Sequence, residues 1–229
     1  MKLIVCGTGS SGNCYVLTNG EETLVLEAGL SIKTVQVAIG FKVRTIKGLL
    51  VTHEHKDHSR YTFEYEIAGI PRYEPYKEEE PPRQCQFGRF NIQCFPLVHN
   101  VPCYGFLIQH PEIGRFLYVT DTEYVPFLFK DINAILIEAN YSKKYLDTSA
   151  PNYLHVKQGH MDIQTTIDCI KAIAANTTDL RDVILCHLSD DHGDPGEFWA
   201  ETNAIVPAGC RVTVAGNGLA FDLKDGILF

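Results

Sequence analysis

The sequence predicts an α/β fold that is rich in strands, with helices interspersed. Short apolar runs bounded by turn residues dominate the first half of the chain, and three other segments show helical periodicity or capping residues. The chain has 229 residues, of which 45% are hydrophobic and 21% are charged. This globular composition allows one sizeable core, so we expect residues 1–229 to form a single domain.

The predicted strands are short apolar runs that turn residues separate. They cover residues 3–6, 14–18, 23–26, 48–52, 90–95, 104–109, 116–120, 134–138, 183–187 and 211–215. Asn19-Gly20 follows the second run and favours a two-residue turn, because both positions of such a turn accept a positive φ angle. We therefore expect the second and third strands to be antiparallel neighbours.

Three helices are expected between these strands. Ser31 can cap a helix that ends at Gly40 and has aliphatic side chains on one face. Asp162 begins a second helix with four isoleucines on one face, and Pro195 lies early in a third. The segment 73–83 is polar and stiffened by prolines, so we expect an exposed loop there.

Charge and cysteine content narrow the classes of function. The chain has 20 Lys and Arg against 28 Asp and Glu, and the resulting net charge of −8 at pH 7 repels polyanions. No apolar stretch approaches the ~18 residues of a membrane span, and the opening segment lacks the apolar region of a signal peptide. Eight cysteines without a CxxC pair argue against a disulfide scaffold or a zinc ribbon. We expect a cytoplasmic protein with no membrane partner.

The segment 53–58 holds the most informative residues and directly follows a predicted strand. With nine histidines in the chain, six positions would hold about a quarter of one by chance, yet this segment holds three, together with two carboxylates. A solvated loop has no reason to concentrate imidazole. Imidazole and carboxylate suit Zn²⁺, Mn²⁺ or Fe, and this spacing in a tight turn can serve two adjacent ions. Further ligands must come from elsewhere in the chain.

The HxHxDH pattern formed by His53, His55, Asp57 and His58 resembles that of the metallo-β-lactamase-fold hydrolases. The resemblance implies an αββα sandwich of two mixed sheets flanked by helices. In that family, further ligands follow later strands, and this chain offers them in the expected order. They are His99, Asp121 and His187.

The resemblance also implies the division of these ligands between two divalent ions. One ion would be held by His53, His55 and His99, the other by Asp57, His58 and His187, and Asp121 would bridge them. We expect zinc, with manganese as the alternative. Two such ions about 3.5–4 Å apart can share a hydroxide, lower its pKa and stabilise the charge at the attacked centre. Asp57 is expected to take direct part in catalysis.

A glycine-rich segment, residues 7–12, formally matches GxGxxG, but the helix that a dinucleotide fold needs next is missing from the pattern. Two interpretations stay open. The segment is a purely structural turn, or it lies near the metals, where Ser10, Ser11 and Asn13 would bind a substrate phosphate. Glu27 stands where the family carries aspartate, and it can still accept a hydrogen bond from a metal-bound histidine.

Local motifs favour a phosphodiester substrate. Residues 9–14 (GSSGNC), 159–161 (GHM) and 187–189 (HLS) resemble motifs of the WalJ/YycJ-like, nuclease-related branch. His160 is the best candidate for substrate contact or for proton delivery to the leaving alkoxide. Weaker candidates for that role also follow the last ligand. They are Asp190, Asp191 and His192.

The substrate is expected to be a small nucleotide. Basic residues are scattered, with only modest clusters at 42–47 and 143–144, so a long nucleic acid is disfavoured. The chain resembles, in length and motifs, the anti-Pycsar phosphodiesterases that open cyclic mononucleotides. An exonuclease on DNA or RNA is the alternative, and a metal-stabilised binding protein without turnover is a third hypothesis. Several aromatic side chains could stack a base, line a homodimer interface or pack in the core. They are Tyr61, Phe63, Tyr65, Tyr73 and Tyr76.

Overall fold

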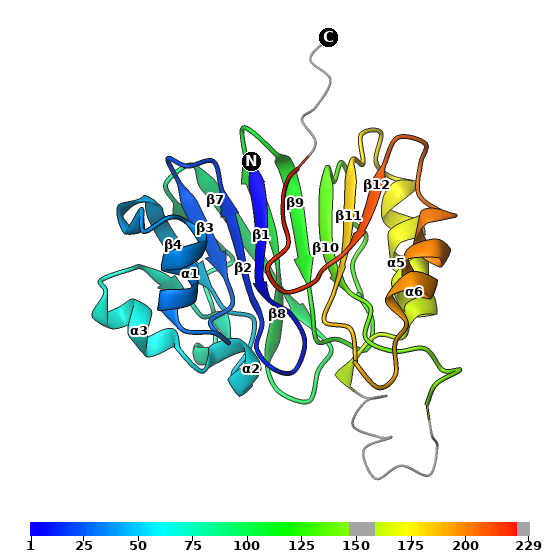
Figure 1. The fold of residues 1–229 in the computed structure, drawn as a ribbon, viewed down its shortest axis with the longest axis horizontal. Coiled ribbons are helices and arrows are strands. Elements are labelled where there is room, and N and C mark those ends of the chain that lie inside the picture. The colour runs from blue at the N-terminus through cyan, green and yellow to red at the C-terminus, as the bar shows by residue number, and fades with distance from the viewer. Residues whose placement is uncertain (147–158, 224–229) are drawn as a thin grey trace.

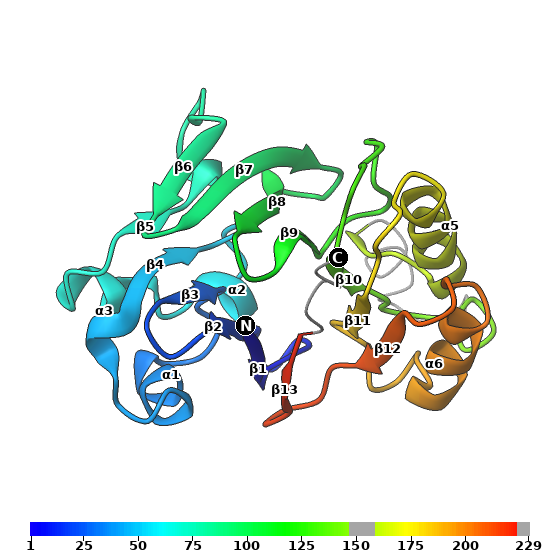
Figure 2. The same ribbon diagram turned by 90° about the horizontal axis from the view of Figure 1, so that it is seen from above.

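Two mixed sheets pack face to face in the computed structural model, which describes residues 1–146 and 159–223, and helices cover both outer faces (Figures 1 and 2). The first sheet has the strand order β13-β1-β2-β3-β4-β5 and the second β12-β11-β10-β9-β8-β7-β6. This arrangement confirms the predicted αββα sandwich.

The strands of the first sheet are β1 (Lys2–Gly7), β2 (Cys14–Thr18), β3 (Thr23–Leu26), β4 (Ile46–Leu50), β5 (Arg72–Tyr73) and β13 (Ala220–Asp222). Those of the second are β6 (Gln84–Phe87), β7 (Phe90–Leu97), β8 (Cys103–His110), β9 (Gly114–Val119), β10 (Ala134–Glu138), β11 (Asp182–Cys186) and β12 (Arg211–Val214). The helices are α1 (Ile32–Ala38), α2 (Lys56–Ser59), α3 (Thr62–Ile67), α5 (Ile163–Ala174) and α6 (Pro195–Asn203), with 3₁₀ turns at Val43–Thr45 and Pro75–Lys77.

Apolar side chains form three layers because the central strands are buried on both faces. Tyr15 of β2 packs between the sheets, whereas its neighbour Val16 packs beneath α1 and α3. In β10, Leu136 packs between the sheets and Ile135 packs against α5 and α6. The continuous apolar runs of the sequence therefore correspond to strands with two buried faces.

Parallel pairing brings chemically active residues to one edge of the sandwich. β3 runs parallel to β4, and β9, β10, β11 and β12 are parallel neighbours. Parallel strands end at the same edge of a sheet, so residues that follow them in the sequence become neighbours in space. The residues after β3, β4, β9 and β11 include Glu27, His53, Asp121 and His187.

The structure corrects two local predictions near the N-terminus. β2 and β3 are antiparallel as expected, but Thr18 pairs with Thr23, so the loop has four residues rather than two. Ser31 makes no side-chain cap, because the Glu64 carboxylate accepts from the Ile32 N–H instead.

The segment 73–83 is only partly the exposed loop that its composition predicts. Tyr73 is buried at the end of β5, and Pro75–Lys77 form a 3₁₀ turn. The short strands β5, β6 and β13 were not predicted, because each has only two to four residues and carries polar side chains. The helices beginning after Asp162 and at Pro195 are confirmed, and the Asp162 side chain accepts from the Gln164 N–H.

None of the helices in residues 1–146 and 159–223 has the length and apolar character needed to cross a bilayer.

Candidate metal centre

Three strand-end residues of the site take a backbone conformation that is uncommon for residues other than glycine. Glu27, Asp121 and His187 have φ angles of 67°, 51° and 54°. Positive φ in such residues costs on the order of 1–3 kcal/mol each and clusters at functional sites, where the surrounding structure holds it. At this edge of the sandwich, the bend turns each chain segment directly after a strand and holds its polar side chain among the site residues.

The turn 53–58 is held by close backbone packing. The N–H groups of Asn13 and Ala28 donate to the carbonyls of Asp57 and His58, both at 2.7 Å. A Cβ on Gly29 would lie 1.9 Å from the Asp57 carbonyl, so only glycine fits there. The glycine-rich segment 7–12 packs against the same backbone, because the Gly12 N–H donates to the Gly9 carbonyl at 3.0 Å and a Cβ on Gly12 would lie 2.8 Å from the Gly29 carbonyl. This segment is thus at least a close-packed turn beside the site.

The first group of donors consists of His53, His55, His99 and Asp121, and their ligand atoms lie within 4.8 Å of one another. His99 Nε2 is 3.3 Å from His55 Nδ1, and His53 Nε2 is 3.7 Å from Asp121 Oδ2. Burial lowers the pKa of His53 and lowers that of His99 to about 4, so both rings are neutral and can bind a metal. His53 Nε2 is buried and has no hydrogen-bond partner among the described residues, which fits an atom that binds a metal ion.

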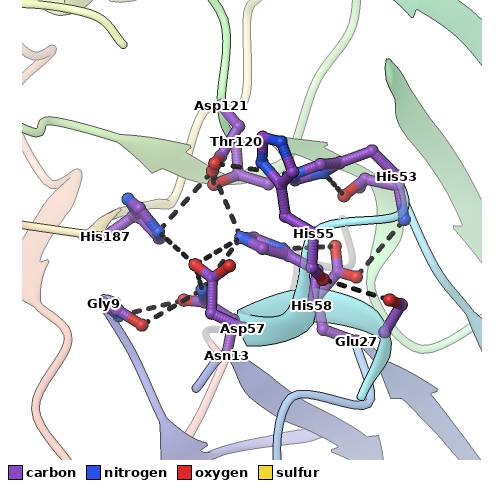
Figure 3. Close-up of polar contacts among 12 residues, drawn as sticks. Gly9, Asn13, Glu27, His53, His55, Asp57, His58, Thr120, Asp121 and His187 are labelled. Atoms are coloured by element: carbon purple, nitrogen blue, oxygen red, sulfur yellow. Dashed lines mark hydrogen bonds and ion pairs between the residues drawn. The ribbon is translucent and has the colours of Figure 1, made fainter. Parts of the chain in front are cut away.

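The second group consists of Asp57, His58, Asp121 and His187, whose side chains point toward one another in Figure 3. Asp57 Oδ2 lies 3.3 Å from His58 Nε2 and 3.5 Å from His187 Nε2. Burial disfavours a charged His187, but Asp121, Asp57 and Glu138 outweigh it and raise its pKa to about 10. Ion binding would release such protons, since a ligand imidazole must be neutral.

Asp121 belongs to both groups and presents a different oxygen to each. Its Oδ2 faces His53, whereas its Oδ1 lies 3.4 Å from His58 Nε2 and 3.7 Å from His187 Nε2. Burial opposes ionisation of Asp121, but the charges of His187 and His58 outweigh it and lower its pKa. The residues present therefore fit two ions that share one carboxylate, and His/Asp clusters of this kind suggest a dimetal site.

Glu27 reaches the site despite its longer side chain. Its Oε1 accepts from the Tyr118 hydroxyl at 3.0 Å and lies 3.5 Å from His58 Nδ1. Its Oε2 accepts from the Thr52 N–H at 3.3 Å. The contact with His58 Nδ1 is an ion pair rather than a hydrogen bond, and it places the carboxylate on the side of the ring that faces away from the other donors of the second group.

Glu138 was missed by sequence reasoning and joins His160 to the site. Its Oε1 lies 2.6 Å from His160 Nδ1 and 3.3 Å from His187 Nδ1. Burial disfavours charge on His160, but the Glu138 carboxylate outweighs it and raises the His160 pKa. The available signal was an acidic residue at the end of the otherwise apolar strand β10.

The predicted substrate residues are placed differently from one another. Ser10 and Ser11 are exposed in the turn between β1 and β2, and their role stays a prediction. Asn13 is fully buried, so its predicted substrate contact is wrong. Its Oδ1 accepts from the Gly9 N–H, and its Nδ2 lies 3.0 Å from His58 Nε2. Asp190 and Asp191 are exposed, and their role also stays a prediction.

Two of the five aromatic candidates are core residues. Tyr65 and Tyr73 are buried, so base stacking or a homodimer interface is wrong for them. Phe63 is 54% exposed, and Tyr61 and Tyr76 are half-buried, so the prediction stands for these three.

Known proteins resemble the chain in both sequence and fold. The model of the metallo-beta-lactamase superfamily matches residues 7–60. Exodeoxyribonuclease YycJ of Bacillus anthracis is 25% identical over 221 residues, which cover 82% of each chain. The metallo-beta-lactamase fold protein YhfI from Bacillus subtilis superposes with a TM-score of 0.71 at 16% identity, covering 96% of this chain and 98% of that one. A diphosphatase from the PhnP family gives a TM-score of 0.67 at 14% identity and covers 98% of each chain.

The chain therefore has the metallo-β-lactamase fold. Together with the donor groups around Asp121, this makes it a metal-dependent hydrolase. Its sequence is weakly similar to the WalJ/YycJ exodeoxyribonucleases.

Proposed function

We propose that the chain is a two-metal phosphodiesterase that opens cyclic mononucleotides to linear monophosphates, with zinc as the expected ion and manganese as the alternative. The observation that carries this proposal is the position of Asp121, with one oxygen toward each donor group. His53, His55 and His99 would complete one ion site. Asp57, His58 and His187 would complete the other. When bound, two such ions lower the pKa of water and offset negative charge at phosphorus.

His160 is the residue that we assign to protonation of the leaving group. Hydrolysis adds the oxygen of water to phosphorus and breaks one P–O bond, so the departing alkoxide must take up a proton. Glu138 holds the His160 ring at Nδ1 and favours its protonated form. The His160 ring is stacked with that of His187, with centroids 5.3 Å apart, so the proton lies beside the donor groups.

Chemistry at phosphorus is supported by the names of two relatives. One is an exodeoxyribonuclease and the other a diphosphatase, and both names denote hydrolysis at phosphorus. The diphosphatase resembles the chain in fold alone, because the two sequences are 14% identical. The local sequence motifs that favour a phosphodiester point in the same direction.

The arrangement of basic residues supports a small substrate. Lys143 pairs with Asp162 at 3.0 Å, and Lys144 pairs with Glu197 at 3.2 Å. The other cluster, residues 42–47, surrounds the start of β4, whereas His53 follows the end of that strand. Neither cluster is placed as a continuous track of free cations leading to the donor groups. A polyanion needs such a track to offset the chain's charge of −8.

A direct assay tests the proposal. Zinc-loaded and manganese-loaded protein is incubated with 3′,5′-cyclic mononucleotides, and linear monophosphates are expected by chromatography. Asp57→Ala should abolish product, whereas Glu54→Gln, which changes an exposed acid in the same turn, should not. No turnover of any cyclic mononucleotide with either metal contradicts the proposal.

An exonuclease is the second candidate, because a relative with that name matches 82% of the chain. The same protein is offered 5′-phosphorylated oligonucleotides at low salt. Shortening of the oligonucleotide without opening of cyclic mononucleotides would favour this candidate. Binding of a cyclic nucleotide that survives in Asp57→Ala, with no product from the wild type, would instead indicate a binding protein.

A further inference from the structure

Two fully buried tyrosines from opposite sheets meet next to the candidate metal centre. Tyr15 lies on β2 and Tyr118 on β9, and neither is exposed. Their rings pack edge to face with centroids 5.8 Å apart. Buried tyrosine hydroxyls usually have a hydrogen-bond partner, and both of these have one that leads towards the second donor group.

The Tyr15 hydroxyl belongs to a series of hydrogen-bonded groups that lies between two candidate ligands, His187 and His58. The His187 N–H donates to Thr8 Oγ1 at 2.9 Å, and Thr8 Oγ1 lies 2.8 Å from the Tyr15 hydroxyl. Tyr15 donates to Asn13 Oδ1 at 3.1 Å, and Asn13 Nδ2 lies 3.0 Å from His58 Nε2. The Thr8 and Tyr15 hydroxyls each donate one hydrogen bond and accept one, so the donor and acceptor roles along this series are consistent. Hydrogen bonds in such a series strengthen one another cooperatively.

The Tyr118 hydroxyl reaches the opposite side of the same imidazole. It donates to Glu27 Oε1 at 3.0 Å, and that oxygen lies 3.5 Å from His58 Nδ1. Tyr118 therefore acts on the Nδ1 side of His58 through Glu27, whereas Tyr15 fixes Asn13, whose side chain packs beside His58 Nε2 and donates to the Gly9 carbonyl. The Tyr15 series also holds the backbone of His187, whose φ of 54° needs such support.

We infer that Tyr15 and Tyr118 are positioning residues for the second ion site, a role that rests on the two-metal site of the proposed function. Phenylalanine would fill the same space between the sheets, so packing alone does not explain the two hydroxyls. Tyr65 provides the comparison, because it is also fully buried but its hydroxyl has no hydrogen-bond partner within residues 1–146 and 159–223. Neither hydroxyl contacts His53, His55 or His99, so the first ion site should be much less affected.

Metal titration of the full chain tests the inference with a readout other than activity. Metal-free protein is titrated with Co²⁺, with affinity followed by calorimetry and site geometry by visible absorption. Removing an outer contact of a metal ligand costs about 10–100-fold in metal affinity. The tyrosine hydroxyls lie one contact further out, so we expect a loss near the lower end, about 10-fold. Tyr15→Phe and Tyr118→Phe should weaken Co²⁺ binding at the second ion site by this factor and alter the absorption spectrum of the ion bound there. Binding of the other Co²⁺ equivalent, at the first ion site, should be retained. Tyr65→Phe should titrate like the wild type.

A second pair of variants covers the case in which Tyr15→Phe does not fold. Thr8→Val removes the hydroxyl that links His187 to Tyr15, and Thr8→Ser retains it. Loss of the second equivalent in Thr8→Val with recovery in Thr8→Ser supports the inference. Unchanged binding of both equivalents in Tyr15→Phe or in Thr8→Val overturns it, as does equal weakening of both equivalents.

The outcome is distinguishable from failure of the proposed function. If the wild type binds two ions in this tyrosine-dependent way but hydrolyses no phosphodiester, the proposed substrate is wrong and the positioning role stands. If the wild type turns over cyclic nucleotides and the tyrosine variants bind both ions normally, only the positioning role is wrong.

Discussion

Replacing Gly29 with alanine should disturb the second donor group without touching any ligand side chain. The added Cβ would lie 1.9 Å from the Asp57 carbonyl oxygen, and real Cβ atoms essentially never approach closer than 3.0 Å. Moving from 1.9 to 3.0 Å requires α2 to retreat by about 1.1 Å. Metal–ligand distances are held within about 0.2 Å, so Asp57 and His58 could no longer serve one ion together with His187.

The energetic cost follows from the same contacts. A retreat of this size breaks the two 2.7 Å hydrogen bonds from Asn13 and Ala28 to α2. Each contributes about 1 kcal/mol, and overpacking a closed site costs roughly a further 1–3 kcal/mol. We therefore expect Gly29→Ala to lower the unfolding free energy of the metal-free protein by about 3–5 kcal/mol.

Urea unfolding of metal-free protein measures that cost, and metal analysis after dialysis against zinc measures the loss of the second ion. Gly216→Ala is the matched control, because a Cβ there meets nothing within 4 Å and the backbone has no positive φ. A Gly29→Ala protein that unfolds within about 1 kcal/mol of the wild type and keeps both ions would refute the packing argument.

Three further outcomes are expected. Glu138→Gln should reduce kcat by at least about 10²-fold at saturating zinc, because His160 loses the charge that favours its proton; an unchanged kcat in steady-state assays would contradict this. In metal-free protein, NMR titration should place the pKa of His99 near 4, because burial disfavours its charged form. The pKa of His187 should lie near 10, because the neighbouring carboxylates outweigh burial. Two ordinary values near 6.5 would contradict both assignments. Removing the metal with a chelator should abolish hydrolysis. It should also lower the Tm by roughly 8–16 °C relative to protein with free metal at about 1,000 times its Kd. No change of Tm in calorimetry would argue against metal binding to the folded state.

Local patterns in the sequence were sufficient for the fold class and for much of the site. The apolar runs predicted most of the strands, because buried strands leave continuous apolar stretches. The short segment 53–58 predicted metal binding by composition, and the family resemblance pointed to His99, Asp121 and His187, which the structure brings next to it.

Interactions between distant segments were not predictable in the same way. Glu64 replaces Ser31 at the start of α1, and Tyr65 packs in the core although its neighbour Phe63 is exposed. Both outcomes depend on how α3 lies against α1 and the first sheet, and no local pattern reports that arrangement.

The sequence by itself determined the identity of the donors, since imidazole and carboxylate chemistry belongs to each side chain wherever it lies. Only the tertiary structure decided that Asp121 turns one oxygen to each donor group and that Glu138 supports His160. It also placed Asn13 beneath His58 rather than in contact with solvent. The physical reason is that coordination and hydrogen bonding depend on distance and direction between atoms, and parallel strand ends from both sheets set these only when the chain has folded.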